Sequence, residues 1–511
     1  MLRPIFTVGG FTLLSRLTGF ARDIVLAAVL GAGPIADAFF VALRLPNHFR
    51  AIFAEGAFNA AFVPAYARIR QQDGSDCAKL FGDQVFTLLF ASQVVLLTLA
   101  LAFTPVLIRL LAPGFAGDQS RFALAAELTR ITFPYLLLVS LVTLYGGILN
   151  ALSRFAAAAA APILLNLSMI FTLALAVFFP TPGHAAAWGV LLAGILEVML
   201  VGGDALRNDV MTALRWPTWD ADVKRFFKAL LPATVGSAGV QIALFADTII
   251  ASFLSAGALS ALYYADRLDQ LPIGVIGIAV GTVLLPEMSS RIAAGDEGAA
   301  RRAQARAIEL ALLLSIPCVV AFLLIPELIM RALFMRGAFT AADASAAGAT
   351  LAAYAIGLLP FVLIRSVTAT FLARGDTATP VKAALTAVAV NVAFKIVLMA
   401  PLAQVGLALA TSIGAWLNLI LVVWFAARAG HLSIDPRLRT SAVRLGLAGC
   451  ILALGLWLAE LVVMRVWPAR AILRDETALA ALAALGAVLY GGALIILFGK
   501  EWLAARARGT T

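Results

Sequence analysis

The chain contains about fourteen segments that are each long and apolar enough to cross a membrane as an α-helix, and this pattern limits the fold more than any other feature. Crossing the hydrocarbon core takes about 20 predominantly apolar residues in helical form. The predicted spans are residues 5–31, 35–65, 85–111, 124–152, 157–179, 185–204, 226–254, 258–286, 307–334, 346–373, 380–400, 403–427, 441–464 and 476–499.

Composition agrees with an all-α integral membrane protein. Of the 511 residues, 62% are apolar and 13% charged, whereas a soluble domain carries about 25% charged residues. The net charge of +10 would suggest nucleic acid in a soluble protein, but the basic residues collect in alternate short loops, so no nucleic-acid partner is expected. The three cysteines and three histidines show no metal-ligand spacing, and no cofactor is expected.

The distribution of basic residues predicts the orientation. With the N-terminus in the cytoplasm, most lysines and arginines of the loops and of the C-terminal tail fall on the cytoplasmic side. The opposite side receives only Arg121, Arg331, Arg336, Arg465, Arg470 and Arg474. Because positive charge is retained in the cytoplasm, both termini are predicted to be cytoplasmic.

An internal repeat divides the chain. At offsets of roughly 224 to 227 residues, Thr7-Val-Gly-Gly recurs at Thr234, Ala21-Arg-Asp at Phe245, Pro134 at Pro360, and Asn166 at Asn391. Each repeat contains an even number of spans, so both copies insert in the same orientation, with an axis along the membrane normal and a substrate site between them. The predicted domains are an N-lobe of residues 1–225, a C-lobe of residues 226–435, and two appended spans within residues 436–511.

Charged side chains inside the spans are the candidate functional residues, because each costs about 2.5–3.5 kcal/mol at mid-bilayer on insertion scales. They are Arg16, Arg22 and Asp23 in the first span, Asp37, Arg44, Arg50 and Glu55 in the second, and Asp266, Arg267 and Asp269 in the eighth. Arg16 and Asp23 are seven residues apart and share a helix face. Pro46 is expected to bend the second span.

Two interpretations of these charges remain open. The acids and arginines could form ion pairs that lock helices together, which suits Asp23, Asp37 and Asp266 as well as a transport role does. The arginines instead favour anion binding, because a planar guanidinium makes bidentate contacts with phosphate. This interpretation is favoured for Arg16, Arg50 and Arg267, whereas Arg22 and Arg44 suit either. For the isolated charges Glu197, Glu309, Arg365 and Glu460, helix pairing is favoured.

Several long motifs resemble one known family. They include Ser15-Arg-Leu-Thr-Gly-Phe-Ala-Arg-Asp23, Asp37-Ala-Phe-Phe-Val-Ala-Leu-Arg-Leu-Pro-Asn47, Phe53-Ala-Glu-Gly-Ala-Phe58, Tyr263-Tyr-Ala-Asp-Arg-Leu268 and Thr379-Pro-Val-Lys382. Together they are similar to the MurJ (MviN) family of bacterial lipid II flippases, in the MOP exporter superfamily. The resemblance covers nearly the whole chain, including the two appended spans.

The resemblance implies alternating access by two six-helix lobes in the bacterial inner membrane. The family moves lipid II, an undecaprenyl-diphosphate-linked disaccharide-peptide, to the periplasmic leaflet without making or breaking a bond. The matching residues imply substrate binding by Arg16, Arg22, Arg50, Arg267 and Asp37, and a cavity or gating role for Asp23, Arg44, Glu55, Asp266 and Asp269. The appended spans imply a groove for the lipid tail. Membrane lipids and other cell-wall synthesis proteins are the further partners implied.

One position departs from the family pattern. Some members hold a sodium ion between spans 7, 11 and 12, at residues that align with Asp247, Asn391, Lys395, Leu407 and Thr411. Lys395 stands where those members have a second acid, so its ammonium group is predicted to pair with Asp247 and to replace the ion. Sodium coupling is therefore doubtful. The alternative is that Lys395 extends to a membrane interface.

Three other functions compete with this prediction. A related MOP-type exporter could carry another polyprenyl-diphosphate glycan or drugs, although a cation exporter would favour acids over arginines in the first eight spans. A membrane glycosyltransferase would need a sizeable outer loop with a catalytic acid, and the outer loops here are short. A non-transporting scaffold would not explain arginines inside the spans.

Overall fold

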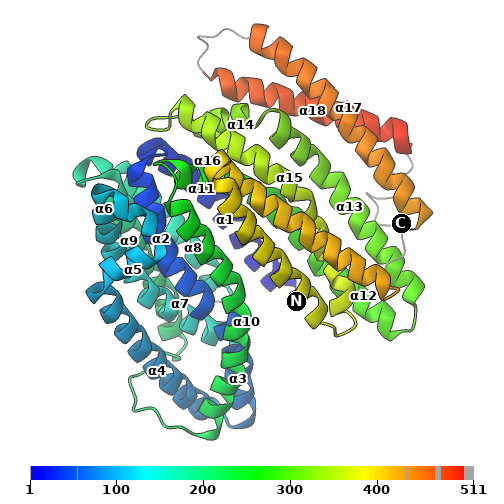
Figure 1. Cartoon of the computed structure of the whole chain (residues 1–511). Coiled ribbons are helices and arrows are strands. Elements are labelled where there is room, and N and C mark those ends of the chain that lie inside the picture. Colours follow the sequence, from blue (N-terminus) through cyan, green and yellow to red (C-terminus); the bar gives the residue numbers. More distant parts are fainter. Residues whose placement is uncertain (1, 54–55, 432–434, 467–472, 500–511) are drawn as a thin grey trace. The chain divides into compact units, whose positions relative to one another are not determined.

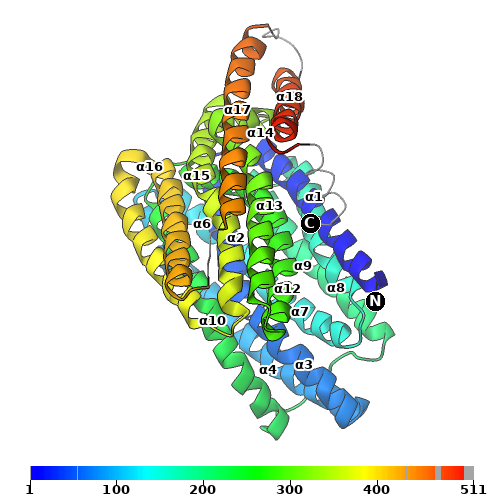
Figure 2. The ribbon, with the colours of Figure 1, turned by 90° about the vertical axis from the view of Figure 1, so that its right-hand side faces the viewer.

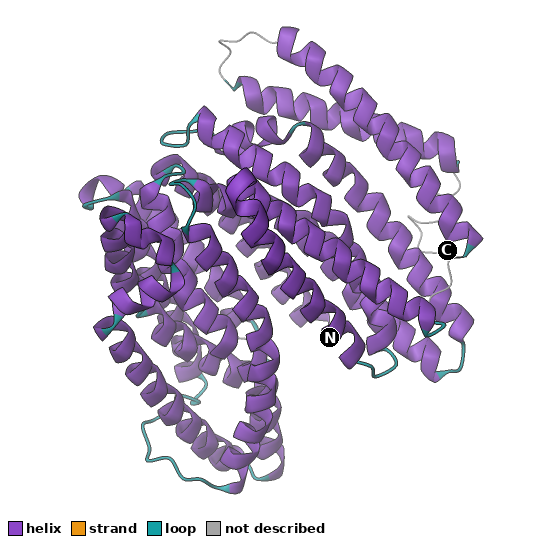
Figure 3. Cartoon of the chain, in the orientation of Figure 1, coloured by secondary structure: helices purple, strands orange, loops and turns teal. Residues whose placement is uncertain are grey.

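The computed structural model describes residues 2–53, 56–431, 435–466 and 473–499. Within these ranges the regular structure is helical, without a strand (Figure 3). The chain forms two compact units. Unit 1 is Met1–Ser260 with Arg336–Phe339, and unit 2 is Ala261–Met335 with Thr340–Thr511. The predicted division into lobes at residue 226 stays a prediction.

The helices of unit 1 are joined by short connections, except for the longer segment 208–220 between α9 and α10 (Figure 1). They are α1 (Leu2–Leu30), α2 (Pro34–Phe53), α3 (Gly56–Gln72), α4 (Ser75–Ala102), α5 (Thr104–Leu111), η1 (Pro113–Gly117), α6 (Gln119–Thr132), α7 (Tyr135–Ala151), α8 (Ala156–Ala174), η2 (Ala176–Phe178), α9 (Pro182–Arg207) and α10 (Ala221–Ser252). Local sequence sets several starts: Thr181 accepts a hydrogen bond from His184 N ahead of Pro182, and Asp220 caps α10.

Unit 2 contains the remaining helices, except for the first residues of α11. They are α11 (Ala258–Pro272), the π-helical turn η3 (Ile273–Gly277), α12 (Ile278–Ala293), α13 (Glu297–Leu324), α14 (Pro326–Phe334), α15 (Ala341–Leu372), α16 (Ala378–Arg428), α17 (Pro436–Val466) and α18 (Arg474–Phe498). Thr340 and Asp343 form a reciprocal capping box at the start of α15.

The described residues of each predicted span are mainly helical. By length and hydropathy, ten helical segments of the described residues qualify as membrane spans. The longest, Ala378–Arg428, contains two predicted spans, because the backbone turns at Ala403 (φ 47°) just after Pro401. The structure therefore confirms an all-helical, multi-pass membrane protein, whereas the count of fourteen spans stays a prediction.

Small residues allow the helices of unit 1 to pack closely. Gly189 of α9 lies against α8, where a Cβ would fall 2.9 Å from Met169 Cα. Such contacts are the usual means of helix association in lipid, where burying apolar area gains little. An aromatic cluster adds specific geometry at the contact of α3, α4 and α10. There Phe62 stacks on Phe81 at 5.7 Å, and Phe226 meets both rings edge-on.

Two glycine loops in unit 1 pack in a crossed arrangement. Gly114, between α5 and α6, lies against the end of α10, where its N–H donates to Ser252 Oγ at 3.0 Å. Gly337, in the segment that follows α14, lies against the end of α1, where Ala338 N donates to Ala28 O at 2.7 Å. A Cβ on either glycine would fall 2.2 Å from the backbone oxygen of Ser252 or of Ala28. The loop of each sequence repeat therefore packs against the first helix of the other repeat.

In unit 2 the appended helices α17 and α18 form a hairpin along α13 (Figures 1 and 2). Tyr490 Oη of α18 donates to Leu313 O at 2.9 Å. At the other end of α18, Asp475 accepts two hydrogen bonds from Arg331 of α14, at 2.7 and 3.1 Å. The hairpin is therefore fixed to the rest of unit 2 by apolar packing and by polar contacts.

Candidate functional site

Arg22 of α1 belongs to a buried polar network. Its guanidinium donates to Asp23 Oδ1 at 2.7 and 3.0 Å and to Asn166 Oδ1 of α8 at 3.0 Å. The Asn166 amide nitrogen in turn donates to Ser15 O and Thr18 Oγ1. Arg22, Asp23 and Asn166 are each less than 10% exposed. For Arg22 and Asp23 the geometry matches the ion-pair interpretation, since the guanidinium is already neutralised and hydrogen-bonded.

Arg16 differs from Arg22 in its exposure and in its polar contacts. It stands halfway along α1 (Leu2–Leu30), and its side chain is exposed. It makes no hydrogen bond or ion pair with any residue that the structure describes. Helix periodicity suggested Asp23 as a partner on the same face, but the Asp23 carboxylate is paired with its neighbour Arg22. Arg16 is therefore a guanidinium available to a ligand.

Asp37 is fully buried and contacts backbone groups instead of an arginine. Its two carboxylate oxygens accept from Gly257 N at 2.8 Å and Ser260 N at 2.9 Å, and the Ser260 hydroxyl also donates to it. Arg121 contributes a longer-range charge interaction. Of the two interpretations left open for Asp37, the ion pair with an arginine is not found among the described residues, because Gly257 and the start of α11 supply the donors. Glu55, in the same predicted span, lies outside the described residues.

The other two arginines of the second span have different surroundings. Arg44 of α2 donates to Thr248 Oγ1 of α10 at 2.8 Å, a neutral partner, and it forms no ion pair with the residues that the structure describes. Arg50 interacts electrostatically with Glu197 of α9, a buried carboxylate that also accepts a hydrogen bond from Tyr135 Oη. Helix pairing, the favoured interpretation of Glu197, agrees with these contacts.

In unit 2, the charged residues of α11 lie on different faces. Arg267 is exposed, and its guanidinium donates to Tyr263 Oη at 3.1 Å while lying 4.9 Å from the centre of that ring. Asp266 is half-buried and accepts from Gln270. Asp269 is buried, and its Oδ1 has no hydrogen-bond partner among the described residues. The exposed arginine and the buried acid therefore have separate environments.

The residues predicted to correspond to a sodium site of some family members fall on two elements. Asn391, Lys395 and Thr411 belong to α16, before and after its turn at Ala403, whereas Asp247 belongs to α10. Lys395 is only 2% exposed, so its side chain does not extend to a membrane surface. Thr411 Oγ1 donates to Leu407 O. The pairing of Lys395 with Asp247 stays a prediction.

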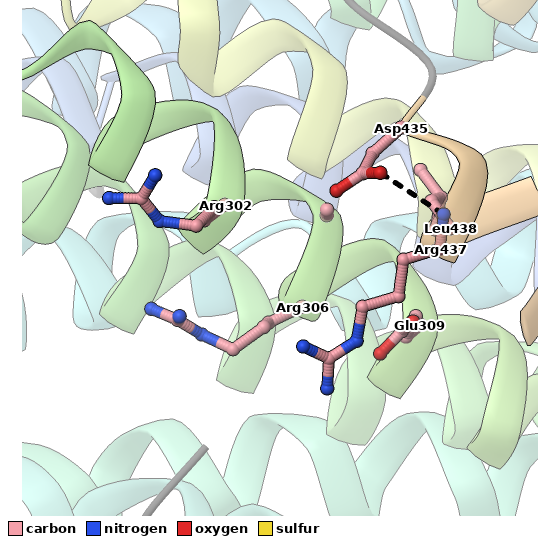
Figure 4. A pocket seen from close by; sticks show the side chains of 7 residues that line it. Arg302, Arg306, Glu309, Asp435, Arg437 and Leu438 are labelled. Carbon is pink, nitrogen blue, oxygen red and sulfur yellow. Dashed lines mark hydrogen bonds between the residues drawn. The ribbon is translucent and has the colours of Figure 1, made fainter.

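A small basic pocket lies between α13 and the start of α17 (Figure 4). It is lined by Arg302, Arg306, Glu309, Asp435, Arg437 and neighbouring apolar atoms. Its acids partly compensate its arginines, and Arg306 also pairs with Glu287 at 3.1 Å. Asp435 accepts from Arg437 N and caps α17. A volume of about 80 Å³ holds a few waters but not a glycan, so this pocket is not the transport site.

Sequence reasoning missed the neutral partners of the site. Thr248 and Ser260 were not singled out, because hydroxyl-bearing residues inside apolar helices most often bond to their own backbone. Asn166 was visible only as a repeat match to Asn391. Its place in the middle of an apolar span was a usable signal, since a buried amide in lipid requires partners.

Comparisons with known proteins agree with the helical architecture. The family model described as "Lipid II flippase MurJ" matches residues 26–473. A "Probable lipid II flippase MurJ" of Rhizobium tropici is 43% identical over 438 residues, covering 84% of this chain and 82% of the relative. A "Lipid II flippase MurJ" of Burkholderia cenocepacia is 35% identical over 470 residues, covering 89% of each chain.

Solved structures show the same fold. One described as "Lipid II flippase MurJ, inward closed conformation" has a TM-score of 0.80 at 23% identity, covering 96% of this chain and 98% of its own. An inward-facing multidrug-resistance MATE family transporter of the MOP superfamily has a TM-score of 0.69 at 15% identity, covering 83% of this chain and 98% of its own. With a family match across most of its length and relatives above 30% identity, the chain belongs to the lipid II flippase MurJ family.

Proposed function

We propose that this protein moves lipid II from the cytoplasmic to the periplasmic leaflet of the bacterial inner membrane by alternating access. Family membership supports the activity, and one structural observation supports the role of the arginines. Arg16 stands halfway along α1, the first predicted span, is exposed, and has no partner among the described residues. Such a group is costly against lipid, so Arg16 faces water and is available to the substrate diphosphate.

In this mechanism Arg16, Arg50 and Arg267 attract the diphosphate while the cavity is open to the cytoplasm. Binding offsets the repulsion among the guanidiniums and favours closure of the inner side. Arg22 acts differently. Its bonds to Asp23 and Asn166 hold α1 against α8, so we assign it a positioning role beside Arg16.

Asp37 has a structural role in the same cycle. Its carboxylate joins α2 to the first residues of α11 through Gly257 and Ser260. Whenever α2 and the start of α11 move apart during the cycle, these hydrogen bonds would have to break. The cycle makes and breaks no covalent bond, and a membrane potential, worth about 2.3 kcal/mol per charge per 100 mV, is sufficient to bias one step.

Reconstitution tests the proposal directly. Purified protein in vesicles with labelled lipid II should expose the label on the opposite leaflet, and Arg16→Ala should slow that exposure by about tenfold or more, since a charge-assisted bond contributes roughly 1.5–3 kcal/mol. Arg207→Ala, at the exposed end of α9, is the matched control and should flip normally. Wild-type rates for Arg16→Ala would remove the diphosphate-binding role.

A further inference from the structure

Unit 2 contains a large pocket that is lined by none of the charged residues described above for the candidate site. Its volume is about 760 Å³, and α12, α15 and α16 form its walls. Apolar side chains such as Leu285, Ile364 and Val381 make up most of the lining, and the polar groups are few. A pocket of this size with a few converging polar groups is typical of a ligand site.

Arg365 of α15 is the charged residue of this pocket. Its side chain is exposed, and it forms no hydrogen bond, ion pair or ring contact with any residue that the structure describes. The helix-pairing interpretation of Arg365 is therefore wrong within the described chain. Arg365 precedes the end of α15 at Leu372 by seven residues, or roughly 10 Å of helix. Because an unpartnered guanidinium at that depth is costly in lipid, its position indicates that water reaches the pocket.

The backbone beside Arg365 makes room for its side chain. The π-helical turn η3 ends at Gly277, and a Cβ on Gly277 would fall 3.0 Å from Arg365 Cδ and Nε. Any larger residue would push the side chain aside. Gly281, one turn later, is likewise open toward Arg365 Cβ, at 4.0 Å. Turns of this type inside helices occur frequently at functional sites.

A second polar group in the wall needs a donor. Asn418 of α16 lines the pocket, and its buried Oδ1 accepts no hydrogen bond from any described residue. A buried acceptor without a partner is uncommon in folded proteins. The pocket thus offers a guanidinium for an anion, an amide for a hydroxyl or amide donor, and apolar walls for the rest of a ligand.

From these observations we infer that the Arg365 pocket binds an oxyanion of the amphiphilic substrate's head group. The inference rests on the proposed function, and it adds an anion contact from unit 2 that is separate from Arg267. The shared chemistry is a phosphate or carboxylate oxygen, and lipid II supplies both, in its diphosphate and in its peptide. Neutral walls around a single cation favour one anionic group with an uncharged remainder.

Accessibility of position 365 is the first test. Cys77, Cys318 and Cys450, the free cysteines, are replaced by alanine, and Arg365→Cys is treated with a membrane-impermeant thiol reagent in vesicles. We expect labelling at a rate comparable to Thr377→Cys, at the pocket mouth. Val488→Cys, exposed on α18, should stay unlabelled because it faces lipid. Absence of labelling at position 365 would place it in lipid and overturn the inference.

Ligand protection is the second test, and it separates the sources of the oxyanion. The reporter is Thr377→Cys, which lines the same pocket while Arg365 stays in place, and lipid II should slow its labelling several-fold. Equal protection by polyprenyl diphosphate without the disaccharide-peptide would assign the contact to the diphosphate, whereas protection by lipid II alone would assign it to the peptide carboxylates. Equal protection by phosphatidylglycerol would show a general lipid site, and no protection by any of them would show no site. Either result overturns the inference.

Function supplies the third test. Arg365→Gln should lower lipid II exposure about tenfold, whereas Arg365→Lys should stay close to wild type because the positive charge remains. Wild-type flipping by Arg365→Gln would overturn the inference. Failure of the proposed function itself has a different signature, because the wild-type protein would then expose no lipid II while the labelling at position 365 would be unchanged.

Discussion

The buried carboxylate of Asp37 allows a structural role to be separated from a transport role. In Asp37→Asn, one of the two oxygens becomes an NH2 group. It would face a backbone N–H of Gly257 or Ser260, both of which now donate to the carboxylate at 2.8 and 2.9 Å. The change removes one charge-assisted bond, about 1.5–3 kcal/mol, and leaves one donor unsatisfied, about 1–3 kcal/mol. We expect a total loss of roughly 2.5–6 kcal/mol.

Unfolding in mixed detergent micelles, followed by tryptophan fluorescence, measures this loss. Asp118→Asn is the matched control, because Asp118 caps α6 through Ser120 and Arg121 with similar geometry but at an exposed site where water replaces lost bonds. It should destabilise less. Wild-type stability of Asp37→Asn would refute the capping argument. If that variant also failed to flip lipid II, the carboxylate would act on charge instead.

Four further predictions follow from single contacts. Gly114→Ala should lower the unfolding midpoint, because its Cβ would fall 2.2 Å from Ser252 O, whereas Gly117→Ala, with open space around its Cβ, should not. Asp475→Asn should destabilise unit 2 by about 1–3 kcal/mol, and a double-mutant cycle with Arg331→Gln should assign the loss to that pair. Exchanging sodium for potassium should leave the unfolding midpoint unchanged. A sodium ion roughly 5 Å from the buried ammonium group of Lys395 would be repelled by about 3 kcal/mol at an effective ε of 20. The hydroxyl of Thr379 lowers the pKa of Asp376. The stability that this cap contributes is therefore present above the ordinary aspartate pKa, and it is lost as the pH falls through the lowered pKa. Asp376→Asn should remove that acid-dependent step from a pH titration of the unfolding midpoint.

The membrane helices could be predicted because lipid imposes a simple rule of length and apolarity on every span. Breaks inside the spans were harder to find. The gap between the predicted spans 380–400 and 403–427 coincides with the turn at Ala403, whereas the predicted span 85–111 is interrupted at Phe103, between α4 and α5. The length and apolarity of the segments therefore predicted the fold class and most helix positions, but they did not predict the breaks inside the spans.

The partners of the charged residues were less predictable for two physical reasons. Periodicity paired Arg16 with Asp23, but the long Arg22 side chain folds back onto its neighbour and takes that carboxylate. Asp37 bonds mainly to backbone N–H groups of Gly257 and Ser260. Every residue except proline carries such a donor, so no sequence letter identifies which turn will supply it.

The crossed packing of Gly114 and Gly337 bears on how a chain of this kind arose. The loop of each sequence repeat packs against the end of the first helix of the other copy. In a self-associating single-repeat ancestor, the same reciprocal exchange would form a two-fold symmetric dimer contact. Gene fusion would then have preserved an existing interface. The two glycines lie at that interface, where any larger residue would clash, so they should be the least replaceable residues of both repeats.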